Sequence, residues 1–441
     1  MMDDGDDLER SALSKASWRL LPLIGLGYGI AYMDRINISF AALQMNRDLH
    51  FSATVYGLGG GLFFLSYALF EVPSNLFLVR FGARRWIARI MVSWGVIACA
   101  MMFVKTPLAF YITRFLLGFA EAGFFPGVIY YLTQWFPAAH RSRAVSRFYI
   151  AWPLSAVVMG AIAGALLNLQ GTLGLAGWQW LFLVEGLPAV AMSAAIIFLL
   201  PDGPDNAAWL SGAEKQWIRS RLASDAAALA PQRRHGIRAA LTDPLVLKLS
   251  AINFLLLGSF YAFTLSAPAL LNDATRLGAT RVGFLISGAS LLGAVAMLLN
   301  AWHSDRARER FLHVAIPLLL VAAAYAALSQ APTPAFAMAA YALSVASFMA
   351  VAATFWSIPG DVLHPRSTAV SVAAINAIGQ VGSFLSPYVW GLARDATGSF
   401  HAGLIVLPLP FLIAAAIVLS IRRDANAQRV AGEAALGTVS P

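Results

Sequence analysis

The chain alternates between apolar stretches of spanning length and shorter polar or basic segments. Because about 20 apolar residues are needed to cross the hydrocarbon core of a bilayer, each such stretch predicts one membrane-spanning helix. The predicted spans are 20–42, 56–79, 86–104, 108–133, 146–168 and 178–200 in the first half, then 246–271, 282–302, 311–329, 334–357, 367–393 and 400–421 in the second. The pattern predicts an all-α membrane protein with twelve transmembrane helices in two pseudo-symmetric six-helix bundles.

These spans divide the chain into five parts. They are an N-terminal segment (1–19), a first bundle (20–200), a linker (201–245), a second bundle (246–421) and a C-terminal tail (422–441). In the linker, Ser211 and Glu214 have the spacing of a capping box, which predicts a surface helix from Ala213 to Leu229. We therefore expect one short helix outside the membrane between two bundles.

Composition and charge agree with this topology. The chain is 59% hydrophobic and 12% charged, whereas soluble domains have about 25% charged residues. If both termini are cytoplasmic, most of the 31 Lys and Arg residues lie on the inner side, and the outer segments hold Arg47, Lys105, Arg276, Arg281 and Arg394. This asymmetry follows the positive-inside rule, so we expect an inner-membrane protein with both termini in the cytoplasm. The net charge of +9 then reflects topology and not nucleic-acid binding.

Charged side chains interrupt two apolar spans of the first half. Asp34 and Arg35 are neighbours on the first span, and Arg114 and Glu121 share one face of the fourth span, two turns apart. A charge at this depth costs at least ~2.5–3.5 kcal/mol and usually marks a functional site. We expect the two acids to pair with the two arginines in the empty protein. Protonation of the acids would free an arginine, which can hold a carboxylate by two hydrogen bonds.

Two further acids lie in the first half. Glu71, beside Pro73 near the inner end of the second span, is interpreted as a gate or packing contact. Glu185 in the sixth span is a rival proton acceptor, although the neighbouring Gly186-Leu187-Pro188 favours a structural role. Gly118 in the fourth span is interpreted as a close-packing glycine.

The spans of the second half have no Asp, Glu, Lys or Arg in their interiors, so their contribution must be neutral. Asn376 and Gln380 are four residues apart and share a helix face, where they could bind a substrate hydroxyl or carbonyl. Such amides more often bond a neighbouring helix, so both interpretations stay open. Phe355 and Trp356 are candidate aromatic contacts for a substrate. Together with Trp152, they slightly favour a flat or aromatic acid as that substrate.

Several short motifs together resemble one known family. They are Tyr32-Met33-Asp34-Arg35-Ile36-Asn37, Phe70-Glu71-Val72-Pro73-Ser74-Asn75, Arg114-Phe115-Leu116-Leu117-Gly118, Glu121-Ala122-Gly123-Phe124-Phe125-Pro126 and Gly177-Trp178-Gln179-Trp180-Leu181-Phe182. A basic loop also recurs after the second span of each half, at residues 80–85 and 305–310. With twelve spans, these features resemble the major facilitator superfamily. Within it they resemble the anion:cation symporter family, whose bacterial members carry sugar acids, tartrate, phthalate and hydroxyphenylacetate.

The resemblance covers about residues 15–420 and implies the major facilitator fold. It implies a substrate role for Arg35, proton-coupling roles for Asp34 and Glu121, and a switching role for Arg114. It also implies that Tyr32 and Tyr67 line the substrate pocket. Trp152 stands where some sugar-acid carriers have Gln, and Gln380 where Asn is common, so the resemblance does not name the acid.

The combined prediction is a proton-coupled symporter that imports an organic carboxylate, such as a sugar acid, a tartrate-like acid or an aromatic acid. An organic-anion exchanger, or a carrier coupled to another ion, is the nearest alternative. A membrane-embedded enzyme would need a nucleophile–base pair or a metal-ligand set, which the spans do not offer, and Cys99 is the only cysteine. A non-transporting receptor of the same fold is the last alternative. We expect no cofactor or metal, and a monomer whose partners are a small carboxylate, protons and the lipid bilayer.

Overall fold

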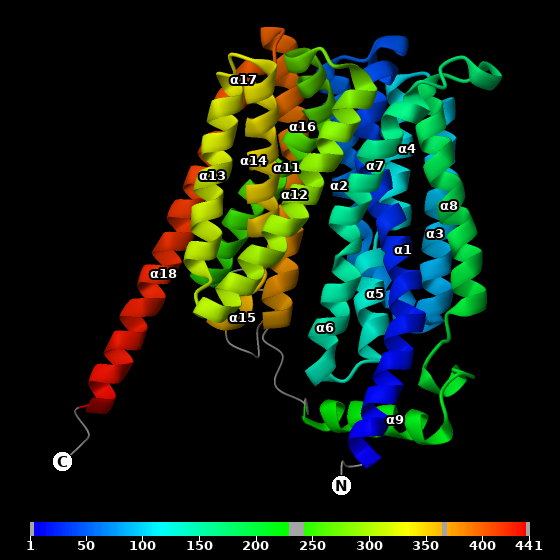
Figure 1. The fold of residues 1–441 in the computed structure, drawn as a ribbon, viewed down its shortest axis with the longest axis vertical. Coiled ribbons are helices and arrows are strands. Elements are labelled where there is room, and N and C mark those ends of the chain that lie inside the picture. Colours follow the sequence, from blue (N-terminus) through cyan, green and yellow to red (C-terminus); the bar gives the residue numbers. More distant parts are fainter. Residues whose placement is uncertain (1–3, 229–241, 364–367, 438–441) are drawn as a thin grey trace. The chain divides into compact units, whose positions relative to one another are not determined.

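The computed structural model describes residues 4–228, 242–363 and 368–437, and these residues form helices and connecting turns without a strand (Figure 1). Part of the predicted linker (229–241) and the outermost residues of the N-terminal segment and the tail (1–3 and 438–441) lie outside this range. Among the described residues, ten helical stretches are long and apolar enough to cross a membrane. The two other predicted spans correspond to α1 (Asp4–Asp48) and α16 (Thr368–Thr397).

The chain forms two compact units. Unit 1 contains Met1–Phe51 and Leu62–Gln232, and unit 2 contains Ser52–Gly61 and Arg233–Pro441. The helix α2 (Ala53–Phe81) therefore contributes its first residues to unit 2 and its remainder to unit 1.

Unit 1 holds the first half of the sequence. Besides α1 and most of α2, its α-helices are α3 (Ala83–Ala100), α4 (Pro107–Glu121), α5 (Phe124–Thr133), α6 (Ala138–Tyr149), α7 (Ala151–Leu167), α8 (Gly177–Leu199) and α9 (Gly212–Ala228). The short 3₁₀ helices are η1 (Met101–Phe103), η2 (Thr172–Gly174) and η3 (Pro204–Asn206). α1 packs against α7 and α8, and α8 also packs against α3 (Figure 1). The fourth and fifth predicted spans are thus each made of two helices.

Unit 2 holds the second half. Its helices are α11 (Pro244–Thr275), α12 (Gly278–Ala307), α13 (Phe311–Ser329), α14 (Pro334–Phe355), α15 (Ile358–Val362), α16, α17 (His401–Val406) and α18 (Pro408–Gly437). α11 packs closely on α16, because Gly382 leaves room for the facing backbone: a Cβ there would lie 2.4 Å from the carbonyl oxygen of Phe254. α14 packs against both α12 and α13 (Figure 1).

The fourth span is broken directly after Glu121. α4 ends at Glu121, and Gly123 takes a left-handed conformation with φ +88° before α5 begins at Phe124. A side chain at Gly123 would be strained by this φ, and its Cβ would lie 2.4 Å from Ser74 Oγ. Gly118 confirms the close-packing prediction, since a Cβ there would lie 2.1 Å from the carbonyl oxygen of Phe63. These glycines hold α4 against α2 and place Glu121 at a helix end.

The predicted linker helix is confirmed as α9, which lies across the end of unit 1 where α1 begins (Figure 1). The capping box is formed: Ser211 N donates to Glu214 Oε2 at 2.7 Å, and Glu214 N donates to Ser211 Oγ at 3.2 Å. Ser11 Oγ and Lys15 Nζ of α1 each donate to Glu214 Oε1 at 2.7 Å. Burial opposes ionisation of Glu214, but these hydrogen bonds outweigh it and lower the pKa of its carboxyl to about 2.

Candidate functional site

The predicted charged residues of α1 and α4 meet inside unit 1. Arg35 forms an ion pair with Glu121, in which Nη2 and Nε of the guanidinium lie 2.5 Å and 2.7 Å from the same oxygen, Oε1. The Glu121 side chain is completely buried, whereas 14% of the Arg35 side chain is exposed. The other carboxylate oxygen of Glu121 has no hydrogen-bond partner among the described residues. The pair therefore has one buried end and one end that solvent reaches.

Arg114 and Asp34 lie beside this pair, and both are almost fully buried at 0% and 1% exposure. The Arg114 guanidinium stacks on the ring of Phe63 at 4.9 Å and acts electrostatically on both Asp34 and Glu121. Asp34 Oδ1 accepts a hydrogen bond from Asn37 Nδ2 at 3.3 Å. The structure thus brings together all four predicted charges. They sum to zero when ionised, which makes their burial tolerable.

One predicted aromatic residue contacts Arg35, and two others pack together on the side of α1 that carries Arg35. The guanidinium lies over the ring of Tyr67 at 4.9 Å, a cation–π contact with α2. Tyr32 is three residues before Arg35 on α1, and its ring packs edge-to-face against Trp152 of α7 at 5.6 Å. Trp152 Nε1 is buried without a hydrogen-bond partner in the described part of the chain. The predicted first-half residues therefore form one cluster, although their substrate roles stay predictions.

The predicted substrate residues of the second half lie in unit 2. Phe355 and Trp356 contact each other with ring centroids 5.3 Å apart, and Trp356 is 37% exposed while Phe355 is buried. Asn376 and Gln380 are half-buried on α16. Gln380 Oε1 accepts no hydrogen bond from the described residues. These side chains offer aromatic surface and an open acceptor, and their role also stays a prediction.

Glu185, the rival proton acceptor of the sequence analysis, is also buried in unit 1. Glu185 of α8 is 2% exposed, and neither of its carboxylate oxygens has a hydrogen-bond partner within the described ranges. Glu71 is half-buried on α2 and acts electrostatically on Arg35, so it lies near the same cluster. The proximity of Asn37 to Asp34 was readable from their spacing on one helix face.

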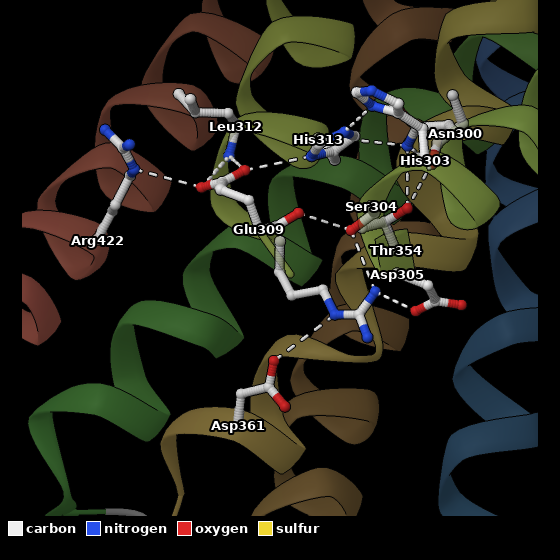
Figure 2. Close-up of polar contacts among 12 residues, drawn as sticks. Asn300, His303, Ser304, Asp305, Glu309, Leu312, His313, Thr354, Asp361 and Arg422 are labelled. Atoms are coloured by element: carbon white, nitrogen blue, oxygen red, sulfur yellow. Dashed lines mark hydrogen bonds and ion pairs between the residues drawn. The ribbon is translucent and has the colours of Figure 1, made fainter. Parts of the chain in front are cut away.

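A separate polar network joins the ends of α12 and α13 in unit 2 (Figure 2). The Glu309 carboxylate accepts from Leu312 N at 2.8 Å, which caps the start of α13, and it pairs with Arg422 of α18 at 3.3 Å. Arg310 forms an ion pair with Asp305, so the basic loop at residues 305–310 contains an acidic partner for one of its own arginines. We interpret this network as structural, because each of these charges has a partner within it.

Two histidines extend the same network (Figure 2). His303 Nδ1 lies 2.6 Å from His313 Nε2, and His313 Nδ1 lies 3.2 Å from Glu309 Oε2. The facing ring nitrogens bond each other, so they do not offer a lone pair to an ion. In the described part of the chain no group of three or more His, Cys, Asp or Glu could hold a metal.

Comparison with known proteins decides the family. The profile described as "Major Facilitator Superfamily" matches residues 24–387. The chain belongs to the major facilitator superfamily. It is 42% identical over 419 residues to a "Putative tartrate transporter" of Agrobacterium vitis, which covers 95% of this chain and 93% of the relative. It is 37% identical over 406 residues to a "Quinolone resistance transporter" of Acinetobacter baumannii, covering 92% of this chain and 94% of that one.

Solved structures of major facilitators share the fold. A bacterial homologue of the human lysosomal transporter Spinster, in an inward-facing and occupied conformation, superposes with a TM-score of 0.76. Its sequence identity is 16%, and the match covers 92% of this chain and 96% of that one. Family membership confirms the predicted all-α major facilitator fold. It makes the protein a multi-pass membrane transporter of a small molecule and not an enzyme.

Proposed function

We propose that this major facilitator is a proton-coupled symporter that imports an organic carboxylate by alternating access. The observation that carries the proposal is the Arg35–Glu121 ion pair. Of the two buried arginines, Arg35 is the one with exposed surface, and in the empty protein its partner is an acid of the protein itself. A substrate carboxylate could therefore reach Arg35 and take the place of Glu121.

The same pair explains how a proton could be coupled to the anion. A guanidinium stays charged at any physiological pH, so the Glu121 carboxyl is the partner whose charge can change. When Glu121 takes up a proton it loses its charge, and Arg35 becomes available to the substrate. Arg114 then remains beside Asp34, which keeps the second arginine compensated. The proton and the carboxylate would therefore be taken up together. A proton on Glu121 without the substrate would leave Arg35 without its anionic partner, and a substrate carboxylate without the proton would place a second negative charge beside Glu121.

The chemical class of the substrate rests on two supports. Arg35 selects an anion, and a relative at 42% identity is named a tartrate transporter. The Tyr67 ring on Arg35, and the packed rings of Tyr32 and Trp152 one turn away on α1, would suit either the flat face of an aromatic acid or the apolar edge of a hydroxy acid. We infer that the substrate is a small mono- or dicarboxylate of one of these classes.

Orientation and assembly are part of the proposal. The distribution of Lys and Arg supports an orientation with both termini in the cytoplasm, and the relatives from Agrobacterium vitis and Acinetobacter baumannii favour a bacterial inner membrane. In that orientation the α9 helix and its contacts with α1 lie on the cytoplasmic surface. We expect the carrier to act as a monomer, because unit 1 alone supplies a complete set of compensated charges.

The first test is the thermal stability of the purified carrier against a panel of carboxylates that includes tartrate, sugar acids and benzoates. A ligand at about 100 times its Kd adds about 2.7 kcal/mol to the stability of the folded state, so binding is easily seen at about pH 5.5 and about pH 7.5. We expect one carboxylate class to stabilise the wild type and not Arg35→Ala. If no carboxylate shifts a folded sample at either pH, the proposal is wrong.

A second test separates symport from exchange. In proteoliposomes, a symporter accumulates labelled carboxylate when only a pH gradient is imposed. An organic-anion exchanger takes up label only when the lumen already contains an anion. Accumulation without an internal anion supports symport. Uptake that depends entirely on an internal anion would show that the carrier is an exchanger and would contradict the proposed symport.

A further inference from the structure

Glu185 is a buried acid that the mechanism above does not use. It lies in the middle of α8, which packs against α1, α3 and α7. Its side chain is 2% exposed, and the described residues provide neither an ion pair nor a hydrogen bond to its two oxygens. An ionised carboxylate without a partner in such a place is far more costly than a neutral carboxylic acid.

The polar side chains that act on Glu185 come from α1. They are the Asn37 carboxamide and the Asp34 carboxyl, which are 0% and 1% exposed. Asn37 Nδ2 donates to Asp34 Oδ1 at 3.3 Å, whereas Asn37 Oδ1 has no donor among the described residues. The Asn37 carboxamide therefore faces both Asp34 and Glu185. Its amide nitrogen donates to Asp34, and its carbonyl oxygen has no donor among the described residues.

A single proton on Glu185 would give both the Glu185 carboxyl and Asn37 Oδ1 a hydrogen-bond partner. A protonated carboxyl has an O–H donor, which an ionised carboxylate lacks. If Glu185 carries the proton, its O–H can donate to Asn37 Oδ1 while Asn37 Nδ2 continues to donate to the Asp34 carboxylate. An ionised Glu185 would leave Asn37 Oδ1 and both of its own oxygens without partners, and would add repulsion from Asp34.

The other helices packed on α8 supply no cation to replace this proton. From α3, Cys99 faces Gly186, where a Cβ would lie 2.5 Å from its Sγ. The basic residues of α3 lie in its N-terminal half, at Arg84, Arg85 and Arg89. α7 (Ala151–Leu167) has no titratable side chain. The group that acts most directly on Glu185 is thus another acid, Asp34, which itself lies beside Arg114 and Glu121.

We propose that Glu185 is a proton-binding site of this carrier, and that Asn37 couples it to Asp34 so that the two acids share one proton. The orientation of the Asn37 carboxamide, with its donor on Asp34 Oδ1, fits the arrangement in which Glu185 carries the proton and Asp34 is ionised. When the proton leaves the Glu185 O–H and binds an oxygen of Asp34, half a turn of the Asn37 carboxamide presents its donor to Glu185 and its acceptor to Asp34. The Glu185 O–H bond breaks and an Asp34 O–H bond forms, the two hydrogen bonds of Asn37 exchange partners, and no other covalent bond changes. The transport consequence rests on the proposed proton-coupled function, but the proton site itself does not.

Infrared spectroscopy of the purified carrier in lipid tests the proton site without any substrate. The probe is the carbonyl stretch of protonated carboxylic acids, followed as pH is raised from weakly acidic to neutral. We expect Glu185→Gln to lose one band of a carboxylic acid that exchanges slowly with deuterated water. Glu214→Gln, which removes an acid of α9 outside the spans, should leave that band unchanged. If the band is the same in wild type and Glu185→Gln, Glu185 is not a proton site.

Asn37→Leu keeps Glu185 in place and tests the coupling even if Glu185→Gln does not fold. It removes the acceptor for the Glu185 proton, so the same band should move to the higher frequency of a carboxylic acid without a hydrogen bond. An unchanged band in a folded Asn37→Leu protein would overturn the link through Asn37.

Transport gives the functional readout, with tartrate as the first probe. Glu185→Gln should still catalyse exchange of tartrate across the membrane, but its accumulation in a pH gradient should be lost. Accumulation equal to that of the wild type would overturn the role of Glu185 in coupling. If the wild type itself does not accumulate a carboxylate in a pH gradient, the proposed function fails, whereas the infrared result still decides whether Glu185 holds a proton.

Discussion

Glu121→Gln tests whether an acid of the protein competes with the substrate for Arg35. Glu121 Oε1 accepts from Nη2 at 2.5 Å and from Nε at 2.7 Å of the same guanidinium. A hydrogen bond to a charged group contributes about 1.5–3 kcal/mol. Because both contacts share one oxygen and Arg35 is 14% exposed, we count them as one such bond. Releasing Arg35 from this competition should tighten carboxylate binding about 10- to 100-fold.

The assay is carboxylate binding by calorimetry at weakly acidic and weakly basic pH. The wild type should bind more tightly as pH falls, because protonation of Glu121 then frees Arg35. Glu121→Gln should bind with the tight affinity at both pH values. The matched control is Glu71→Gln, since Glu71 also acts electrostatically on Arg35 but forms no ion pair with it in the described structure.

Stability and affinity should move in opposite directions. Removing one partner of a buried ion pair costs about 3–5 kcal/mol, and the exposed end of Arg35 places this pair near the lower limit. Glu121→Gln should therefore melt earlier than the wild type and yet bind better. If it binds more weakly than the wild type at both pH values while Glu71→Gln is normal, Glu121 positions Arg35 for the substrate and does not compete with it.

Three further outcomes are expected. The pKa of the Glu214 carboxyl is lowered to about 2, so the ionised carboxylate stabilises the contact of α9 with α1 by at most about 3 kcal/mol. This stabilisation is complete above about pH 4.5 and is lost as the pH falls towards 2. Glu214→Gln should remove the stabilisation at neutral pH, which would be measured as faster amide exchange in α9. Gly118→Ala should lower the melting temperature by the equivalent of about 1–3 kcal/mol, because the new Cβ meets the carbonyl of Phe63, whereas Gly25→Ala, with open space, should not. Arg114→Lys should fold but lose most uptake, because an ammonium does not reproduce the contact of the planar guanidinium with the Phe63 ring that places its charge near Asp34 and Glu121.

The spans and the linker helix were predictable from sequence for a simple reason. Membrane helices must satisfy their own backbone hydrogen bonds and bury apolar surface in lipid, so the local amino-acid composition predicts where they lie in the sequence. The capping box at Ser211 is equally local, and α9 follows it. Pairing of the buried acids with the arginines was predictable because unpaired charges are costly at membrane depth, whereas the choice of Glu121 as the partner of Arg35 was not.

Features that depend on packing between helices were not predictable. The break after Glu121 needs the left-handed Gly123, whose space is limited by a serine of another helix. The approach of Glu185 to Asn37 depends on the register of α8 against α1, which no local pattern specifies. The sequence shows only the Gly and Pro residues that follow Glu185 in α8, whereas the polar groups that act on it in space, an amide and a second acid, come from α1.

One continuous helix links the surface of unit 1 to its interior. α1 runs unbroken from Lys15, which holds α9, to Asn37, which faces the buried acids. These residues are about 33 Å apart along the helix axis. A tilt of about 10° about its inner end would displace the other end by about 6 Å over this length. If protonation of the buried acids tilts α1, a fluorophore on α9 will report that movement from the surface of unit 1, although it touches none of the acids.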